Sequence, residues 1–197
     1  FVIDDSGNSV VCEGWYFVMP FSDVSIKATY TEKSARIPLW LESFEDYAAG
    51  AKVAQQAAAV VSGRWTTWNN QPGLDEDALV SMEQVCHGTK SMKLTFGNDI
   101  VLLLDQTKGA YEIGMKIFVP SEKNAYFNLL HVFDGDNTEW AFQSYFNSDV
   151  DEYGNIVLTP GVGYIDADGA GSKKFVCASD KWMDICLKVD IDKDSAE

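Results

Sequence analysis

The chain has 197 residues, of which 46% are hydrophobic and 13% aromatic, enough for one sizeable domain with a small satellite. Thirty acidic residues against fifteen lysines and arginines give a net charge of -15. This charge argues against nucleic acid or an anionic membrane as a partner, because both require a positively charged surface. No apolar run approaches the roughly 18 residues needed to span a bilayer, so we expect no membrane span.

The pattern of the chain favours strands over helices. Short aromatic segments that alternate between apolar and polar residues lie between Gly, Asn, Asp and Pro turns, which is typical of the strands of a sandwich. An Ala- and Gln-rich run predicts one short helix at 53–61. Because strands and helices do not alternate, we expect an all-β fold rather than a doubly wound one. Six strands are expected, at 94–104, 111–119, 126–133, 140–146, 175–177 and 182–191.

Several motifs along residues 43–197 carry a family resemblance. They begin with S-F-E-D-Y-A-A-G at 43–50 and R-W-T-T-W-N-N-Q-P-G-L-D-E-D-A-L-V-S at 64–81, and continue with K-G-A-Y-E-I-G-M-K-I-F-V-P-S at 108–121 and K-W-M-D-I-C-L-K-V-D-I-D-K-D at 181–194. In order and spacing they resemble the concanavalin A-like (lectin/glucanase) jelly-roll modules of secreted multidomain Bacteroidetes proteins. The resemblance implies a jelly-roll β-sandwich of two antiparallel sheets over 43–197.

The first 32 residues resemble something different. Y-F-V-M-P-F-S-D-V-S-I-K-A-T-Y-T-E at 16–32 is similar to the closing half of an internalin B-type β-repeat of bacterial surface proteins. The resemblance implies a partial surface β-repeat at 1–32, joined by a linker at 33–42 in which Pro38 favours an extended chain. Together the two resemblances imply a protein that is secreted or lies on the outer cell surface.

The last motif of the chain bears on where the expected sandwich ends. V-D-I-D-K-D at 189–194 resembles a family phrase that further strands follow. We therefore expect the sandwich to be incomplete at its C-terminal end, with an open sheet edge near Leu187.

Two of the expected strands share a polar and aromatic face. Alternation along residues 140–147 places Trp140, Phe142 and Phe146 on the core side. The other side, joined by a neighbouring strand, is expected to form the floor of a carbohydrate-binding groove with Tyr126, Asn128, Gln143, Tyr145 and Asn147. A half-exposed strand face without a ligand is the alternative.

Trp65 and Trp68 are further candidates for carbohydrate binding, because aromatic rings stack on sugars. Residues three apart on a strand point to opposite faces, so the two indoles cannot form one flat platform. The alternative is that one indole fills the core and the other covers a loop. The amides of residues 69–71 would supply donors and acceptors for sugar hydroxyls.

A structural calcium ion is a further prediction. In many jelly-roll binding modules an early Glu and a late Asp share a calcium ion, which makes Glu45 and Asp190 the candidate pair. Backbone carbonyls would complete the six to eight oxygens that calcium takes. Lys193 stands where the resembling family has Asn. The alternative is a solvated acidic rim.

No catalytic motif was found in the sequence. It lacks the Glu-x-Asp-x-x-Glu strand of glycosidases on this fold, as well as nucleophile-elbow, zinc and nucleotide motifs. We therefore expect a non-catalytic module that binds a polysaccharide or a glycoprotein glycan. The alternatives are an accessory domain of a glycoside hydrolase or peptidase and a purely structural spacer. The four cysteines are expected to be thiols, and the sequence carries no signal for an oligomeric state.

Overall fold

The computed structural model describes residues 38–60, 64–167 and 171–196, together with the strand backbone at 2–4, 9–10, 12–13, 16–17 and 24–26. The chain divides into two units, Phe1–Leu41 and Glu42–Glu197. The first unit contains five short strands: β1 (Val2–Asp4), β2 (Ser9–Val10), β3 (Cys12–Glu13), β4 (Tyr16–Phe17) and β5 (Val24–Ile26). They pair antiparallel as a three-stranded sheet in the order β2-β1-β5 and a separate β3-β4 pair.

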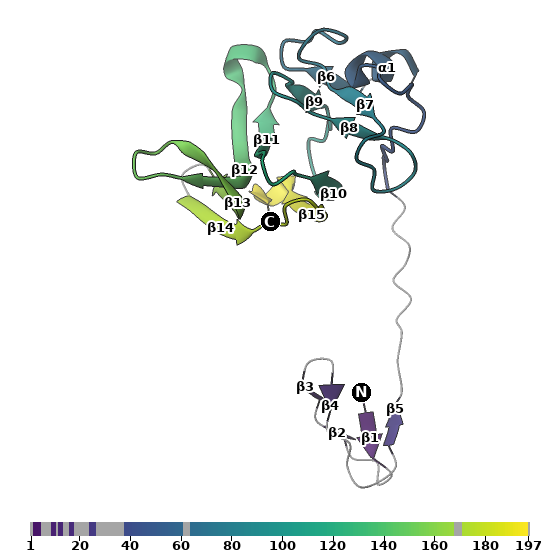
Figure 1. Cartoon of the computed structure of the whole chain (residues 1–197), viewed down its shortest axis with the longest axis vertical. Coiled ribbons are helices and arrows are strands. Elements are labelled where there is room, and N and C mark those ends of the chain that lie inside the picture. The colour runs from purple at the N-terminus through teal and green to yellow at the C-terminus, as the bar shows by residue number, and fades with distance from the viewer. Residues whose placement is uncertain are drawn as a thin grey trace. The chain divides into compact units, whose positions relative to one another are not determined.

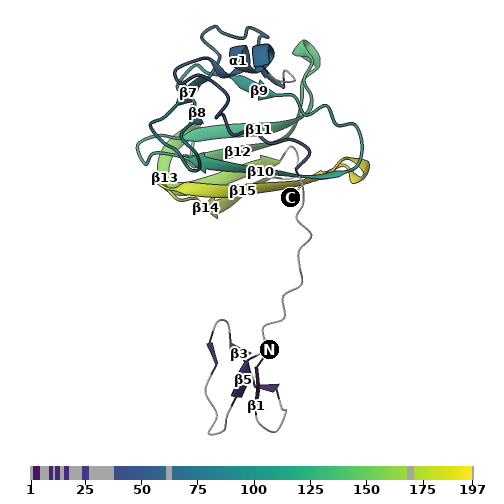
Figure 2. The same ribbon diagram turned by 90° about the vertical axis from the view of Figure 1, so that its right-hand side faces the viewer.

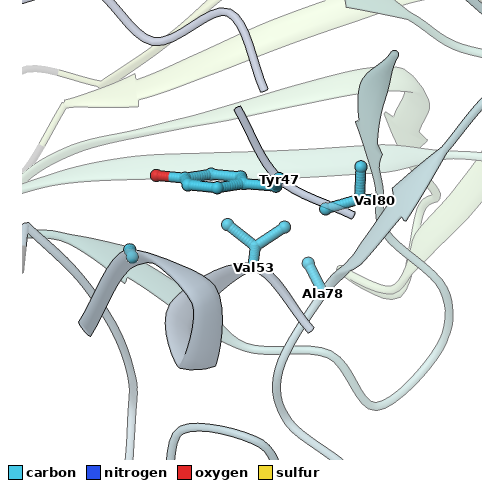
Figure 3. Packing of buried hydrophobic residues seen from close by; sticks show 5 residues of the cluster. Tyr47, Val53, Ala78 and Val80 are labelled. Atoms are coloured by element: carbon cyan, nitrogen blue, oxygen red, sulfur yellow. The ribbon is translucent and has the colours of Figure 1, made fainter. Parts of the chain in front are cut away.

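The second unit begins with a small block of short elements around one helix (Figure 1). Helix α1 (Val53–Val60) forms where the Ala-rich run predicted it. Strand β6 (Trp65–Thr67) pairs with β9 (Ile100–Leu102), and β7 (Leu79–Ser81) pairs with β8 (Ser91–Lys93). Figure 3 shows the core of this block beside the helix, where the buried side chains are Tyr47, Val53, Ala57, Ala78 and Val80.

Two larger antiparallel sheets follow. One has the order β10-β15-β16, from β10 (Ala110–Phe118), β15 (Trp182–Asp190) and β16 (Ser195–Ala196). The other has the order β11-β12-β13-β14, from β11 (Ala125–Val132), β12 (Glu139–Val150), β13 (Ile156–Ala167) and β14 (Gly171–Val176). Two short 3-10 helices, Gly135–Asn137 and Ile191–Lys193, complete the elements. The predicted all-β class is confirmed, while the jelly-roll order of strands stays a prediction.

The two larger sheets pack face to face around a second core. Val119, Phe146 and Cys177 are its buried residues. Around them pack Ile117, Met183 and Ile185 from the β10–β15 side, and Ala125, Phe127 and Phe175 from the other sheet. Figure 2 shows β10 and β15 running in front of the four-stranded sheet. The shared core makes residues 110–190 a two-layer sandwich.

A glycine makes room for one of these core rings. A Cβ atom on Gly163 would lie 2.4 Å from Phe175 Cζ and 2.8 Å from the Tyr145 carbonyl oxygen. Because such contacts are too close for any side chain, only glycine lets Phe175 lie flat against β13.

Two of the sequence predictions about strands need correction. Residues 94–104 are not one strand, because β8 ends at Lys93 and β9 begins at Ile100. Between them the Asn98 side chain accepts a hydrogen bond from the Thr95 amide at 2.7 Å, and this bond closes a turn. The second error concerns Trp140, which was predicted to lie in the core but is 41% exposed. Register shifts near Leu130 interrupt the alternation there, whereas Phe142 and Phe146 are buried as predicted.

The outer edge of β15 is covered only at one end. Strand β16 pairs with Val189 and Asp190, and in the described part of the chain no strand pairs with β15 on this side between Trp182 and Lys188. The expected incompleteness of the sandwich at its C-terminal end stays a prediction.

Candidate functional site

A row of tyrosines and a row of polar residues cross the sheet side by side. Tyr126 on β11 lies opposite Tyr145 on β12, which lies opposite Tyr164 on β13. Two positions along the strands, Asn128, Gln143 and Asp166 form the second row. Directly opposed residues project to the same side of a sheet, here the side away from the shared core. We call this surface the tyrosine–amide face, made of Tyr126, Asn128, Gln143, Tyr145, Tyr164 and Asp166.

Hydrogen bonds connect four of these side chains. Asn128 Nδ2 donates to Tyr126 Oη at 2.9 Å. Tyr126 Oη and Tyr145 Oη both donate to Gln143 Oε1, at 3.0 and 3.1 Å. In this arrangement Asn128 Oδ1 and Gln143 Nε2 have no hydrogen-bond partner among the described residues. An amide has two donors and an acceptor, so the network leaves both kinds of group for a ligand.

The three tyrosine rings pack against one another. The Tyr145 and Tyr164 ring centroids lie 4.4 Å apart with the planes only 13° from parallel, and Tyr126 lies 4.9 Å from Tyr145 at 53°. Tyr164 is 5% exposed, whereas Tyr126 is 44% exposed. The packing thus fixes Tyr145 between two neighbours and leaves Tyr126 as the tyrosine with the most accessible ring.

The phenols of Tyr145 and Tyr164 stay protonated at neutral pH. Burial raises the pKa of Tyr145 to about 12, with a further contribution from Tyr126, Tyr164 and Asp166. Burial also raises the pKa of Tyr164, together with the nearby carboxylates of Asp166 and Asp149. Tyr145 is therefore a neutral hydrogen-bond donor at physiological pH.

Asn147 does not belong to this face, and the prediction that it does was wrong. The chain has φ of 49° at Asn147, and the pairing of β12 with β13 shifts register between Phe146 and Ser148. This bulge ends the alternation and turns the Asn147 side chain inward, where it is 0% exposed. Its Nδ2 donates to the carbonyls of Pro120 and Lys123, and its Oδ1 accepts from Gly161 N, Cys177 Sγ and Ser179 Oγ.

The two tryptophans of the Trp65–Trp68 segment lie in different clusters. Trp65 is half-buried, donates from Nε1 to Glu42 Oε2 at 3.1 Å and packs against Phe44. Trp68 follows the end of β6 and stacks on Trp140, with ring centroids 6.0 Å apart. Neither indole is a member of the tyrosine–amide face. Their role in carbohydrate binding stays a prediction.

The two predicted calcium ligands, Glu45 and Asp190, each accept hydrogen bonds from other residues of the chain. Glu45 accepts hydrogen bonds from the Thr89 and Lys90 amides at 2.8 Å and from Thr89 Oγ1 at 2.7 Å. Asp190 accepts from Lys193 N and lies 2.6 Å from Lys193 Nζ. No group of three or more His, Cys, Asp and Glu that would hold a metal ion occurs in the part of the chain that the structure describes. A calcium ion shared by Glu45 and Asp190 would have to displace these partners, and its presence stays a prediction.

Sequence reasoning missed two members of the face, Tyr164 and Asp166. Strand β13 was not among the expected strands, and neither Tyr164 nor Asp166 was among the candidate site residues. The signal was present in V-G-Y-I-D at 162–166, because Tyr164 and Asp166 have the same two-residue spacing as Gln143 and Tyr145. Antiparallel pairing of β12 with β13 then brings the two sets together.

The predicted thiols are present wherever the structure describes a cysteine side chain. Cys86, Cys177 and Cys186 are free, and Cys186 lies opposite Gly114 in the other sheet from Cys177. The side chain of Cys12 lies outside the described residues. Among the described residues no disulfide joins the two sheets of the sandwich, which pack around the second core.

Comparisons of the chain with protein-family models, with curated proteins and with solved structures found no match. Among the described residues no helix has the length and apolar character needed to cross a bilayer.

Proposed function

We propose that residues 42–197 are a non-catalytic module that binds a polysaccharide or a glycoprotein glycan, as part of a secreted or surface-exposed bacterial protein. The tyrosine–amide face is the binding site, and the hydrogen-bonded network of Tyr126, Asn128, Gln143 and Tyr145 is the observation that carries the proposal. The resemblance of residues 43–197 to concanavalin A-like jelly-roll modules supports it.

The chemistry of the face suits sugar hydroxyls. Each hydroxyl both donates and accepts a hydrogen bond, and the amides of Asn128 and Gln143 offer one acceptor and one pair of donors without a protein partner among the described residues. The exposed ring of Tyr126 adds an apolar surface for the C–H groups of a sugar. A shallow site of this kind predicts weak binding, on the order of micromolar to millimolar.

The charge of the face limits the chemical class of glycan that it would bind. Lys174 lies opposite Tyr164 on β14, but its Nζ is 2.7 Å from the Asp149 carboxylate and so its charge is balanced. Asp166 places one of the chain's thirty acidic side chains on the face itself, and the net charge of the chain is -15. We therefore propose a ligand without uronate or sulfate groups, because these would be repelled.

Affinity gels and a glycan array on the full chain test this proposal. Tyr126→Ala should weaken binding to the best neutral polysaccharide by about tenfold, a loss of about 1.4 kcal/mol. Tyr153→Ala is the matched control, because Tyr153 is 81% exposed in the β12–β13 turn and is not on the face. Both variants should unfold at the temperature of the unmodified chain.

Two outcomes would remove the proposal. One is that no plant, algal or host glycan binds. The other is that Tyr126→Ala and Tyr153→Ala bind the polysaccharide equally well, which would place the binding site elsewhere.

A further inference from the structure

Asp166 is the charged group of the tyrosine–amide face, and the contacts of the described residues do not neutralise it. It lies opposite Gln143 at the end of the polar row. Its side chain is half-buried, yet it has no hydrogen bond or ion pair within the described part of the chain. A partly buried carboxylate without a partner is costly, so a cation that approaches from the ligand side is favoured.

The neighbours of Asp166 explain why a cation from the ligand would be favoured at this position. Tyr164 lies two residues from Asp166 on the same side of β13, and Tyr145 lies opposite Tyr164 on β12. The charge of Asp166 also contributes to the raised pKa of both phenols. The nearest lysine on the same side of β14, Lys174, is held by Asp149. No lysine or arginine of the described residues therefore pairs with Asp166.

The spacing of the strands places Asp166 near the amides that would bind the sugar hydroxyls. Neighbouring strands lie about 4.8 Å apart, so Asp166 is one strand away from the Gln143 amide and two from Asn128. A sugar ring whose hydroxyls bond to the two amides would place a substituent on its other side beside the Asp166 carboxylate. A protonated amine at that position would form a charge-assisted hydrogen bond.

From this geometry we infer that the face prefers glycans with free amino groups, in which a sugar ammonium pairs with Asp166 while the ring hydroxyls bond to Gln143 and Asn128. The inference rests on the proposed function and adds to it the chemical class of the ligand. N-acetylation removes the charge of the amine and should remove the preference.

Isothermal titration of the full chain with glucosamine oligomers and with their fully N-acetylated counterparts tests the inference. At low salt we expect the amino form to bind about tenfold more tightly, and 0.5 M NaCl to reduce that ratio strongly because the Debye length is then only about 4 to 5 Å. Asp166→Asn should bring the two affinities together, so that the ratio between the amino and the acetylated oligomer falls to about one.

The matched control is Glu152→Gln, which removes one negative charge from the exposed β12–β13 turn and keeps Asp166. It should leave the amino-sugar preference intact, since the preference comes from the local pair and not from the net charge. Equal affinity of the unmodified chain for both oligomers, or a preference that survives in Asp166→Asn, would overturn the inference. If neutral polysaccharides still bind and Tyr126→Ala still weakens that binding, the proposed function stands without the amino-sugar preference. Absence of all glycan binding would remove both the proposed function and this inference.

Discussion

Around helix α1 a buried and a half-buried carboxylate have their oxygens hydrogen-bonded within the chain. Across β11–β13, in contrast, surface amides keep donors and acceptors without a partner among the described residues. Asp77 Oδ1 accepts from Ala54 N, and its Oδ2 accepts from Gln55 N and Gly73 N, at 2.8 to 3.0 Å. Glu42 likewise accepts from Phe44 N, Tyr47 Oη and Trp65 Nε1. Polar residues around helix α1, the first region, therefore stabilise the fold. Those on β11–β13, the second region, keep hydrogen-bonding groups that a ligand could use.

The same difference distinguishes the first motifs of the resembling segment from the candidate site. The motifs at 43–50 and 64–81 contain Tyr47, Trp65 and Asp77, all of which have structural partners. The tyrosine–amide face comes from residues 126–166 instead. The named side chains of these first two motifs therefore stabilise the fold, and the proposed binding site lies further along the same resembling segment.

The largest effect is expected for Asp77→Ala. Asp77 is 0% exposed and binds the first turn of α1, so the change leaves one buried and two partly buried amide N–H groups without an acceptor. We expect a loss of about 3 kcal/mol in the free energy of unfolding. Chemical denaturation measures it, with Asp77→Asn as the milder control that keeps one acceptor. A loss below about 1 kcal/mol would show that the first region is not held in this way.

A smaller effect is expected at alkaline pH. Both regions contribute to it, because burial and the hydrogen bond to Glu42 also raise the pKa of Tyr47 in the first region. The unfolded phenol titrates near 10 and folded Tyr145 at about 12, so the folded state binds more protons between these values. Stability should therefore fall as the pH rises from about 10 to 12. Tyr145→Phe should make this fall shallower in pH-dependent denaturation, with Tyr164 retaining part of it. An unchanged slope would mean that the ring stack does not shift the Tyr145 pKa.

The smallest effect is expected from metal removal. The oxygens of Glu45 and Asp190 already accept hydrogen bonds from Thr89, Lys90 and Lys193. Calorimetry with and without a chelator should accordingly give unfolding temperatures within about a degree of each other. A drop of several degrees on chelation would instead support the calcium ion that the sequence predicts.

Sequence reasoning succeeded where alternation is regular and failed where bulges interrupt it. The helix at 53–60 and four of the five predicted face residues follow from local pattern alone. Asn147 and Trp140 were misplaced because each lies beside a register shift, which a two-residue period cannot anticipate. Tyr164 and Asp166 were missed because their place on the face depends on which strand pairs with β12, a long-range contact that the pattern of β13 alone does not determine.

The most direct test of the account is the polysaccharide affinity of Gln143→Met, measured beside its free energy of unfolding. Gln143 accepts from both phenols and keeps its Nε2 donors for a ligand, while methionine has a similar length and only a weakly accepting sulfur. We expect at least a tenfold loss of affinity for a neutral polysaccharide with a change in stability below about 1 kcal/mol, the reverse of Asp77→Ala. Unchanged affinity, or a loss of affinity that only accompanies unfolding, would contradict the claim that this face binds glycan.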